Sequence, residues 1–583
     1  MDYAGLVAVY EQLESTSKRL EKTFFIAELL KRTPADDLSR VLLLLQGKVF
    51  SAGDERKAGV AAKTVAKTII RASGSSQQKV EDAWKKTGDL GIAAEQLIGR
   101  RLQTTLGSSG RLSVAKVLNT LQKLATMEGH GAVAKKVDLI SEVLASASAG
   151  EAKYLVRLLL EELRVGAADC TIRDAIVWAF FSKEAHLIYD SGKQAAVVAD
   201  EHRKEYSQIV DEVQHAYDLA NDFGVVAQAA KKGREALSSI SLAVGIPLKV
   251  MLFQKAKGIA DAFSRVGKPA AFEFKYDGFR LNIHKKGKEV TLFTRRLENV
   301  TVQFPDIIAA IAEHVHAKDA ILDAEVIGID QATGKWKPFQ DISQRIKRKY
   351  DIAELVQSVP VMVNVFDILA LNGKSMIDSP FSERRKAIEQ VVSPASGRLQ
   401  LAEQIITDSE EAVENFYKKA LSLGNEGIMG KNLAAPYKPG SRVGFGVKIK
   451  PTLDPLDLVI TAATWGEGRR VSWLSSFLLS CRDGNSYREV GRVGTGIKEL
   501  EGSGVTFQEL TTLLKPLIVR ESGNAVFLKP RVVVEVAFEE VQKSTAYNSG
   551  FALRFPRLLR LREDKPAREA ATLAEVKGMY EGQ

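Results

Sequence analysis

Charged residues alternate with large apolar residues in the stretch 271–280. Successive side chains of a β-strand point to opposite faces, so one face is predicted to cover a core and the other to border solvent or a ligand. The apolar face carries Phe272, Phe274 and Tyr276, and the charged face carries Glu273, Lys275 and Asp277. The Asp-Gly pair that follows is the usual signal for a tight hairpin turn. By themselves, these residues fit a half-buried hairpin with a solvated lysine as well as a reactive site.

Two carboxylates further along the chain stand at unusual positions. Glu325 lies inside the apolar run 321–326, and burying an unpaired carboxylate is costly. We therefore expect Glu325 to meet a metal, a ligand hydroxyl or a cation, and a cation could make a purely structural ion pair. Glu426 precedes Gly427, which permits a bend, and the cation Lys431 follows.

Two lysines are predicted to share one strand face, because Lys448 and Lys450 alternate with apolar residues. Adjacent cations repel each other unless they meet an anion, and phosphate is the natural one. A pair of solvated lysines on an edge strand is the simpler alternative. In the extended run 361–369, Phe366 lies opposite the valines, where it could belong to a core or form a platform for a base.

These residues belong to a region of mixed structure between about residues 236 and 450. Strands are predicted at 289–294, 320–327 and 361–369, and an amphipathic helix at 407–423. The region is therefore expected to be an α+β domain of ordinary size.

The flanking regions differ in composition. Residues 1–235 are rich in Ala, Leu, Glu and Lys with apolar residues at helical spacing, which predicts an all-α domain. Loops rich in Gly and Ser at 51–57, 73–78 and 107–111 could hold a phosphate backbone, although a helical bundle without a ligand is the simpler reading. Residues 451–583 show short strands with turn-rich links, typical of a small β-barrel, and then a terminal helix.

The whole chain has 583 residues, enough for roughly three to four domains. Its formal net charge of +10 suggests a polyanionic partner or merely a basic surface. The two cysteines, Cys170 and Cys481, exclude a disulfide framework and a four-cysteine zinc site, and they suit a reducing compartment. The seven histidines show no metal-type cluster, and we see neither a membrane-spanning run nor a secretory signal.

The order of the motifs is more specific than any single motif. The chain resembles the covalent nucleotidyltransferase superfamily and, in detail, the ATP-dependent DNA ligases of the archaeal and eukaryotic replicative type. The family's motifs correspond, in order, to Lys275–Arg280, Thr294–Asn299, Asp323–Glu325, Phe366–Leu369, Glu426–Met429 with Lys431, Lys448–Lys450, and Arg562–Lys565 preceded by Leu553–Arg557. The likeness extends to the helical region at Tyr154–Arg157 and Leu163–Gly166, so it covers nearly the whole chain.

This resemblance implies a helical DNA-binding domain at 1–235, a nucleotidyltransferase (adenylation) domain at 236–450, and an OB-fold domain with a C-terminal helix at 451–583. It also implies sealing of nicks in double-stranded DNA, in replication, repair and recombination. Lys275 would attack the α-phosphate of ATP and release pyrophosphate. AMP would then pass to the 5′-phosphate at the nick, and the 3′-hydroxyl would displace it.

The attacking lysine must be neutral for this chemistry. A free lysine, with a pKa of about 10.4, is neutral in only about one molecule in a thousand near pH ~7.4. Nearby cations would lower the pKa of Lys275, and the candidates are Arg280, Arg295, Lys448 and a bound metal.

The remaining roles also follow from the resemblance. Glu325 would bind the ribose or a metal, and Glu426 would help to place Mg²⁺, which prefers oxygen ligands. The other expected nucleotide-binding residues are Glu273 and Phe366 at the adenine, Arg442 at the nucleotide, Lys448 and Lys450 at the α-phosphate, and Arg562 and Lys565 at the pyrophosphate. The last two stand in the β domain, which would open and close between steps.

One position departs from the family's pattern. Two residues before the first lysine of the Lys-x-Lys motif, where the family usually has tryptophan, this chain has Gly446, with Phe445 before it. We expect altered local packing at that position.

Other readings stay open at this point. An RNA ligase or a GTP-using capping enzyme would carry similar motifs, and the non-enzyme alternative is a catalytically silent DNA-binding clamp. NAD-dependent bacterial ligases are disfavoured, because they carry a Cys-rich zinc module. We expect a monomer that acts on nicked DNA with ATP and Mg²⁺, in the cytoplasm at the nucleoid and without a membrane partner. A sliding clamp could contact Phe24-Phe25, although helical core is the simpler reading of that pair.

Overall fold

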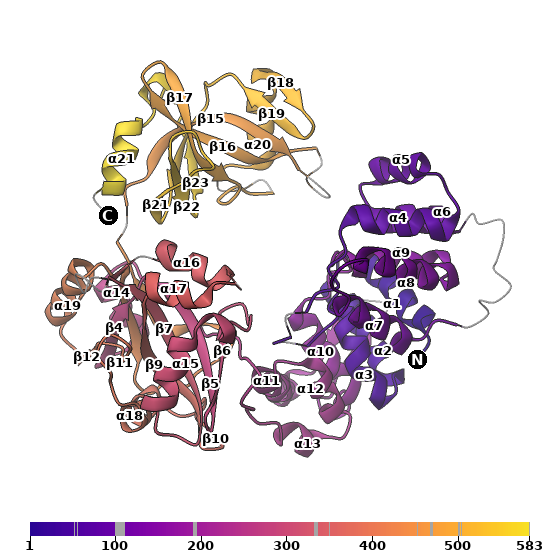
Figure 1. Ribbon diagram of the computed structural model, residues 1–583, viewed down its shortest axis with the longest axis horizontal. Coiled ribbons are helices and arrows are strands. Elements are labelled where there is room, and N and C mark those ends of the chain that lie inside the picture. Colours follow the sequence, from indigo (N-terminus) through magenta and orange to yellow (C-terminus); the bar gives the residue numbers. More distant parts are fainter. Residues whose placement is uncertain are drawn as a thin grey trace. The chain divides into compact units, whose positions relative to one another are not determined.

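Figure 1 shows a computed structural model of the chain. It describes residues 1–583 apart from 52, 55, 100–110, 191–194, 331–335, 338, 349, 452, 467–469, 471, 500, 501, 503, 582 and 583. The chain folds into two compact units, Met1–Ile449 and Lys450–Gln583. Among the described residues, no helix combines the length and the apolar character that a membrane span requires.

The N-terminal region is helical, as its composition predicts (Figure 1). Its helices are α1 (Tyr3–Ser15), α2 (Arg19–Arg32), α3 (Ala35–Leu45), α4 (Ala62–Ser73), α5 (Gln77–Thr87), α6 (Leu90–Ile98), α7 (Val114–Ala125), α8 (Ala132–Ser146), α9 (Ala149–Leu159), α10 (Asp169–Phe180), α11 (Arg203–Ala220), α12 (Phe223–Ala230) and α13 (Arg234–Ser238). Ser148 and Glu151 form a capping box that starts α9, and Gly74 ends α4 in the left-handed conformation. Of the loops considered for phosphate binding, residues 52, 55 and 107–110 lie outside the described residues.

A short hairpin interrupts this helical region. It consists of β1 (Ile188–Asp190) and β2 (Ala195–Val197), and the 3₁₀ turn η1 (Asp200–His202) follows it and leads directly into α11. The aromatic pair considered as a clamp anchor lies nearby: Phe24 stacks on Tyr189 of β1, with ring centroids 4.2 Å apart, and Phe25 packs against the helical core.

The rest of the first unit contains two sheets. A five-stranded sheet has the order β12-β4-β13-β14-β3, and a seven-stranded sheet has the order β10-β9-β7-β5-β6, with β8 beside β7 and β11 beside β9. The strands are β3 (Leu252–Lys255), β4 (Ala270–Lys275), β5 (Phe279–Lys286), β6 (Glu289–Thr294), β7 (Asp319–Ile329), β8 (Trp336–Lys337), β9 (Val361–Leu371), β10 (Lys374–Ser375), β11 (Leu399–Leu401), β12 (Gln404–Thr407), β13 (Gly427–Asn432) and β14 (Arg442–Ile449). The helices are α14 (Ile259–Val266), α15 (Pro305–His314), α16 (Phe339–Lys347), α17 (Ile352–Ser358), α18 (Phe381–Val391) and α19 (Glu410–Ser422).

The alternation along β4 is confirmed on its apolar side. Phe272, Phe274 and Tyr276 all belong to one buried core beneath the five-stranded sheet. The predicted hairpin is wrong, because β4 and β5 belong to different sheets and do not pair. The chain instead crosses between sheets at Gly278, where a Cβ atom would lie 2.2 Å from the carbonyl oxygen of Val326. Glycine is therefore needed at position 278 because the backbone passes close to Val326, and not because a hairpin turn forms there.

The second unit is rich in strands, as its sequence predicts (Figure 1). One sheet has the order β17-β16-β15-β19-β18, with β20 joining β15 to β23, and β21 and β22 form a separate pair. The strands are β15 (Leu456–Trp465), β16 (Leu474–Asp483), β17 (Ser486–Val493), β18 (Ile518–Ser522), β19 (Ala525–Leu528), β20 (Val533–Ala537), β21 (Glu540–Lys543), β22 (Phe551–Arg554) and β23 (Arg557–Leu561). Two helices accompany them, α20 (Phe507–Leu514) and the terminal α21 (Leu573–Glu581).

Candidate active site

The first pair of the site forms where β4 ends and β13 begins. Nζ of Lys275 lies 2.8 Å from Oε2 of Glu426, and both side chains are largely shielded from solvent. The backbone N–H of Glu426 donates to the carbonyl oxygen of Lys275 at 2.9 Å. The following residue, Gly427, has φ +138°, a conformation that favours glycine. The bend predicted at this glycine thus turns the Glu426 carboxylate toward the lysine.

Glu325 lies close to this pair. On the seven-stranded sheet, it stands opposite Arg280 on one side and Asn364 on the other. Burial raises the pKa of Glu325 to about 7, against the opposing charges of Lys275 and Arg280, and the nearby carboxylate of Glu426 raises it further. Two cations, Lys275 and Arg280, therefore act on the charge of this carboxylate.

Arg280 is held in place by a residue that the sequence reading left without a role. Its Nε donates to Oδ1 of Asp323 at 2.8 Å, and a second guanidinium nitrogen donates to the other oxygen of the same carboxylate. The hydroxyl of Tyr437 also donates to Asp323, at 2.7 Å. Burial opposes the charge of Arg280, but the Asp323 carboxylate outweighs it and raises the pKa of Arg280. Arg280 is therefore a fixed positive charge. The position of Asp323 in an apolar strand was a usable signal, whereas Tyr437 stands in no motif.

Phe366 lies between two cations. The guanidinium of Arg280 is 5.1 Å from the centre of its ring, and Nζ of Lys431 is 4.8 Å from the centre. The ring is half-buried, at the edge of the core that contains Phe272 and Phe274. Such a ring can serve both as a core residue and as a stacking platform.

The charged face of β4 was expected to border solvent or a ligand, and this expectation is wrong at Glu273. Its side chain is only 3% exposed, and its Oε2 lies 2.5 Å from Nζ of Lys431. Gln404 donates to its Oε1 at 2.8 Å, and Arg385 lies 3.8 Å from the same oxygen. The β4 carboxylate is thus committed to partners on the neighbouring strands, because a buried charge must be compensated.

The two lysines of the Lys-x-Lys motif differ in their surroundings. Lys448 is half-buried on β14, opposite Met429 of β13 and beside Lys255 of β3. Lys450 begins the second unit, where its Nζ lies 3.1 Å from Oε2 of Glu539.

Two arginines of the expected site are exposed: Arg295, a candidate for lowering the pKa of Lys275, and Arg442, expected at the nucleotide. Arg295 follows the end of β6, and Arg442 is the first residue of β14.

In the second unit, Arg562 and Lys565 converge on one carboxylate. Oδ2 of Asp457 lies 2.7 Å from Nη1 of Arg562 and 2.6 Å from Nζ of Lys565. Asp564 accepts two further hydrogen bonds from Arg562, at 2.9 and 2.7 Å. No sequence pattern singles out Asp457, which stands at the start of β15, roughly a hundred residues before the motif that it holds.

The structure also explains the departure at Gly446. A Cβ atom on this residue would lie 2.4 Å from the ring of Phe253 on β3. The phenylalanine ring therefore fills the space where a larger residue at 446 would have to begin. Any side chain at this position requires Phe253 to move.

Three family models match the chain. The one described as "ATP dependent DNA ligase domain" matches residues 250–450, "DNA ligase N terminus" matches residues 2–177, and "ATP dependent DNA ligase C terminal region" matches residues 470–565.

Two curated relatives match over their whole lengths. The protein named DNA ligase from Nanoarchaeum equitans is 44% identical, over 100% of this chain and 99% of that protein. The DNA ligase of Thermococcus fumicolans is 40% identical, over 100% of this chain and 98% of that protein. The solved structure named Pmar-Lig_Pre has a TM-score of 0.55 at 17% identity and covers 96% of this chain and 99% of its own, which indicates a shared fold.

Proposed function

Because this chain belongs to the ATP-dependent DNA ligases and therefore seals nicks in double-stranded DNA, we propose that Lys275 carries AMP from ATP to the nick. The observation that carries the proposal is the position of the Lys275 amine, sheltered at the end of β4 and 2.8 Å from the Glu426 carboxylate. The relatives' names favour DNA ligation over RNA ligation, capping or a silent clamp.

In the first step, the lysine must lose a proton, because an ammonium group cannot attack phosphorus. Glu426 is the carboxylate within hydrogen-bond reach of Nζ, so it accepts that proton. Nζ then forms a bond to the α-phosphorus of ATP while the bond from that phosphorus to the bridging oxygen breaks. Pyrophosphate leaves with the electron pair, and the nitrogen releases a second proton to solvent.

The second and third steps take place at the same site. An oxygen of the 5′-phosphate attacks the phosphorus of lysyl-AMP, the N–P bond breaks, and Lys275 takes up a proton as it leaves. The 3′-oxygen then attacks the 5′-phosphorus, giving up its hydroxyl proton, and AMP departs. The strand is sealed by the new phosphodiester bond.

Two carboxylates fit a Mg²⁺ ion at this site. Glu325 and Glu426 offer the oxygen ligands that Mg²⁺ prefers, and the two carboxylates are close enough for each to act on the charge of the other. When bound, Mg²⁺ would neutralise charge on the phosphate oxygens. Lys448 would meet the α-phosphate from β14, and Lys450 would have to exchange Glu539 for it.

The adenine and the pyrophosphate would be held by further residues. Phe366 would stack on adenine, while Arg280, anchored by Asp323, supplies a fixed charge beside the ring. The Glu273 carboxylate is committed to Lys431, which favours its backbone as the adenine contact. The exposed Arg295 and Arg442 would reach the nucleotide only when it is bound. Arg562 and Lys565 would orient pyrophosphate after leaving Asp457.

We assign three domains to these tasks, 1–235 for DNA binding, 236–450 for adenylation and 451–583 as an OB-fold. The division between units after Ile449 supports the last boundary, and the antiparallel strands of the second unit support the OB-fold. The enzyme acts as a monomer at the nucleoid in the cytoplasm, and its two cysteines are free thiols, as a reducing compartment allows. We place no sliding-clamp contact at Phe24, because its ring stacks on Tyr189.

The test is formation of a protein–AMP adduct from α-labelled ATP. The wild-type chain is expected to give an adduct that is stable to base and labile to acid, and Lys275→Ala is expected to give none and to seal no nicks. Lys286→Ala, which removes an exposed lysine on β5, is the matched control and should behave as wild type. An adduct that survives Lys275→Ala would overturn the assignment.

A further inference from the structure

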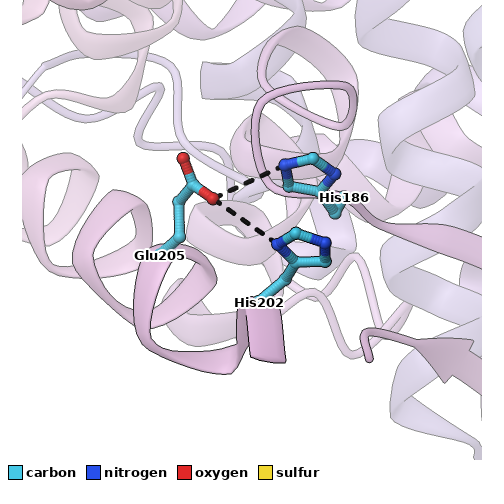
Figure 2. A group of neighbouring side chains, drawn as sticks. All are labelled: His186, His202 and Glu205. Carbon is cyan, nitrogen blue, oxygen red and sulfur yellow. Dashed lines mark ion pairs between the residues drawn. The ribbon is translucent and has the colours of Figure 1, made fainter. Parts of the chain in front are cut away.

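A second cluster of chemically active side chains lies in the helical region, outside the ligase site. His186, His202 and Glu205 each offer one ligand atom, and these atoms lie within 4.8 Å of one another (Figure 2). Oε2 of Glu205 is 3.5 Å from Nε2 of His186 and 3.8 Å from Nδ1 of His202. We propose that these three side chains bind a divalent cation of the zinc class, which fastens the end of α10 to the start of α11.

The fold brings the three residues together from two elements. His202 ends η1, and Glu205 follows three residues later in the first turn of α11, so both side chains lie on one helix face (Figure 2). His186 comes from the turn after α10, where the N–H of Leu187 donates to the carbonyl oxygen of Ser182 at 2.9 Å.

The backbone of His186 is itself unusual. Its φ is +47°, in the left-handed region where such helix-ending turns usually have glycine or asparagine. Its side chain is exposed, so core packing does not account for a histidine at this position. Cation ligation gives this residue a reason to be histidine.

The donor set selects the class of cation. Two imidazole nitrogens and one carboxylate oxygen suit zinc and its neighbours, whereas Mg²⁺ and Ca²⁺ prefer oxygen alone. Donors bound to zinc at about 2.0–2.1 Å in tetrahedral geometry lie about 3.3 Å apart. The Glu205 oxygen lies 3.5 and 3.8 Å from the two nitrogens, and all three ligand atoms lie within 4.8 Å of one another. Each separation must therefore close by at most about 1.5 Å. Three protein ligands leave the fourth position for water.

The two rings stack face to face, with centroids 3.6 Å apart and an angle of 9° between their planes. The neutral imidazole is the form that binds a metal. Each ring must rotate about its Cβ–Cγ bond to direct its lone pair at a shared ion.

Neighbouring charges support the arrangement. Oε1 of Glu201 lies 3.5 Å from Nε2 of His202, so it can accept the N–H of that ring when Nδ1 holds the cation. Such an outer carboxylate commonly orients a metal-binding histidine. The nearby Arg234 is bound to Glu212 through two hydrogen bonds, which leaves Glu205 to the histidines.

The experiment is calorimetric titration of Zn²⁺ into the full-length chain after removal of metals with a chelator. The substitutions are His202→Gln, Glu205→Gln and His186→Asn, because asparagine accepts the left-handed backbone of residue 186. His130→Gln, which changes an exposed histidine elsewhere in the helical region, is the matched control. Nick sealing by each variant reports that it is folded, since none of the three residues belongs to the ligase site.

We expect the wild-type chain and His130→Gln to bind one Zn²⁺ with equal affinity at this site, and each cluster variant to bind at least about 100-fold more weakly, because changing an outer partner alone costs 10–100-fold. Zn²⁺ should also slow amide hydrogen exchange at Leu187 and at 203–205 in wild type only. Absence of Zn²⁺ binding by wild type would overturn the proposal. So would binding that all three variants retain unchanged, because the ion would then sit elsewhere, for example at Glu325 and Glu426.

Discussion

Lys275 and Glu426 are joined twice, through an ion pair of 2.8 Å between their side chains and a hydrogen bond of 2.9 Å between their backbones. The backbone bond fixes where the carboxylate starts, and Gly427 fixes how the chain turns after it. The nucleophile and its proton acceptor are therefore held together before any nucleotide arrives, which lowers the cost of orienting them.

Replacing the proton acceptor should slow the first step. Glu426→Gln keeps the shape of the side chain but cannot take a proton from Lys275, and general-base catalysis is typically worth about 10²–10⁴-fold. We expect adduct formation from ATP to fall by about that factor and to recover partly at higher pH, where hydroxide can replace the missing base. The rate is measured with α-labelled ATP across pH. Glu411→Gln, at an exposed position on α19, should have no effect, and an unchanged rate for Glu426→Gln would contradict the assignment.

The raised pKa of Glu325 predicts a pH-dependent gain in stability for Glu325→Gln. A carboxyl whose pKa is higher in the folded chain stabilises it at low pH, and this contribution is lost as pH rises through about 7. A pKa moved from 4.5 to about 7 corresponds to roughly 3 to 4 kcal/mol. In metal-free buffer near pH 4.5, the variant and wild type should have similar free energies of unfolding in urea. At pH 8, the variant should have the higher free energy of unfolding. A difference that does not change with pH would refute this account.

Breaking the buried ion pair of Glu273 should destabilise the first unit. Lys431→Met leaves the carboxylate buried with weaker compensation, and removing one partner of a buried pair costs about 3–5 kcal/mol. Gln404 and the more distant Arg385 remain, so the lower end of that range is expected. Urea unfolding provides the measurement. Lys418→Met, which removes the surface partner of Glu414 on α19, should cost no more than about 0.5 kcal/mol.

Arg562 and Lys565, which both contact Asp457, should be needed only for the first step, in which pyrophosphate leaves. Arg562→Ala is expected to lose adduct formation from ATP but to seal a nick whose 5′-phosphate already carries AMP, because pyrophosphate leaves in the first step alone. Arg560→Ala, which removes an exposed arginine paired with Glu535, is the matched control. Asp457→Asn should also change the rate of adduct formation while sparing that sealing reaction. Equal loss of both reactions in Arg562→Ala would give this residue another role.

The sequence predicted helices, strands and the types of side chain at the site better than it predicted which side chains contact each other. The strand 289–294 is found as β6 at its predicted bounds, since local alternation sets a strand. The pairing of Glu273 with Lys431 was missed because it depends on which strands lie side by side. The Asp-Gly pair predicted a turn at Gly278, but this glycine instead lets the backbone approach Val326 of β7. Only the fold reveals that neighbour.

Long-range convergence explains the other omissions. Asp457 and the motif it holds are far apart in the chain, and no local pattern links them. His186 and His202 lack the spacing of a zinc motif, and they meet only because the hairpin β1–β2 folds back between α10 and α11.

The central claim is that the amine of Lys275 carries AMP, and peptide mapping tests it most directly. The wild-type chain is incubated with ATP and a divalent metal, digested under conditions that spare the N–P bond, and analysed by tandem mass spectrometry. The account predicts AMP on Lys275 and on no other lysine. AMP found on another residue, with Lys275 unmodified, would contradict it.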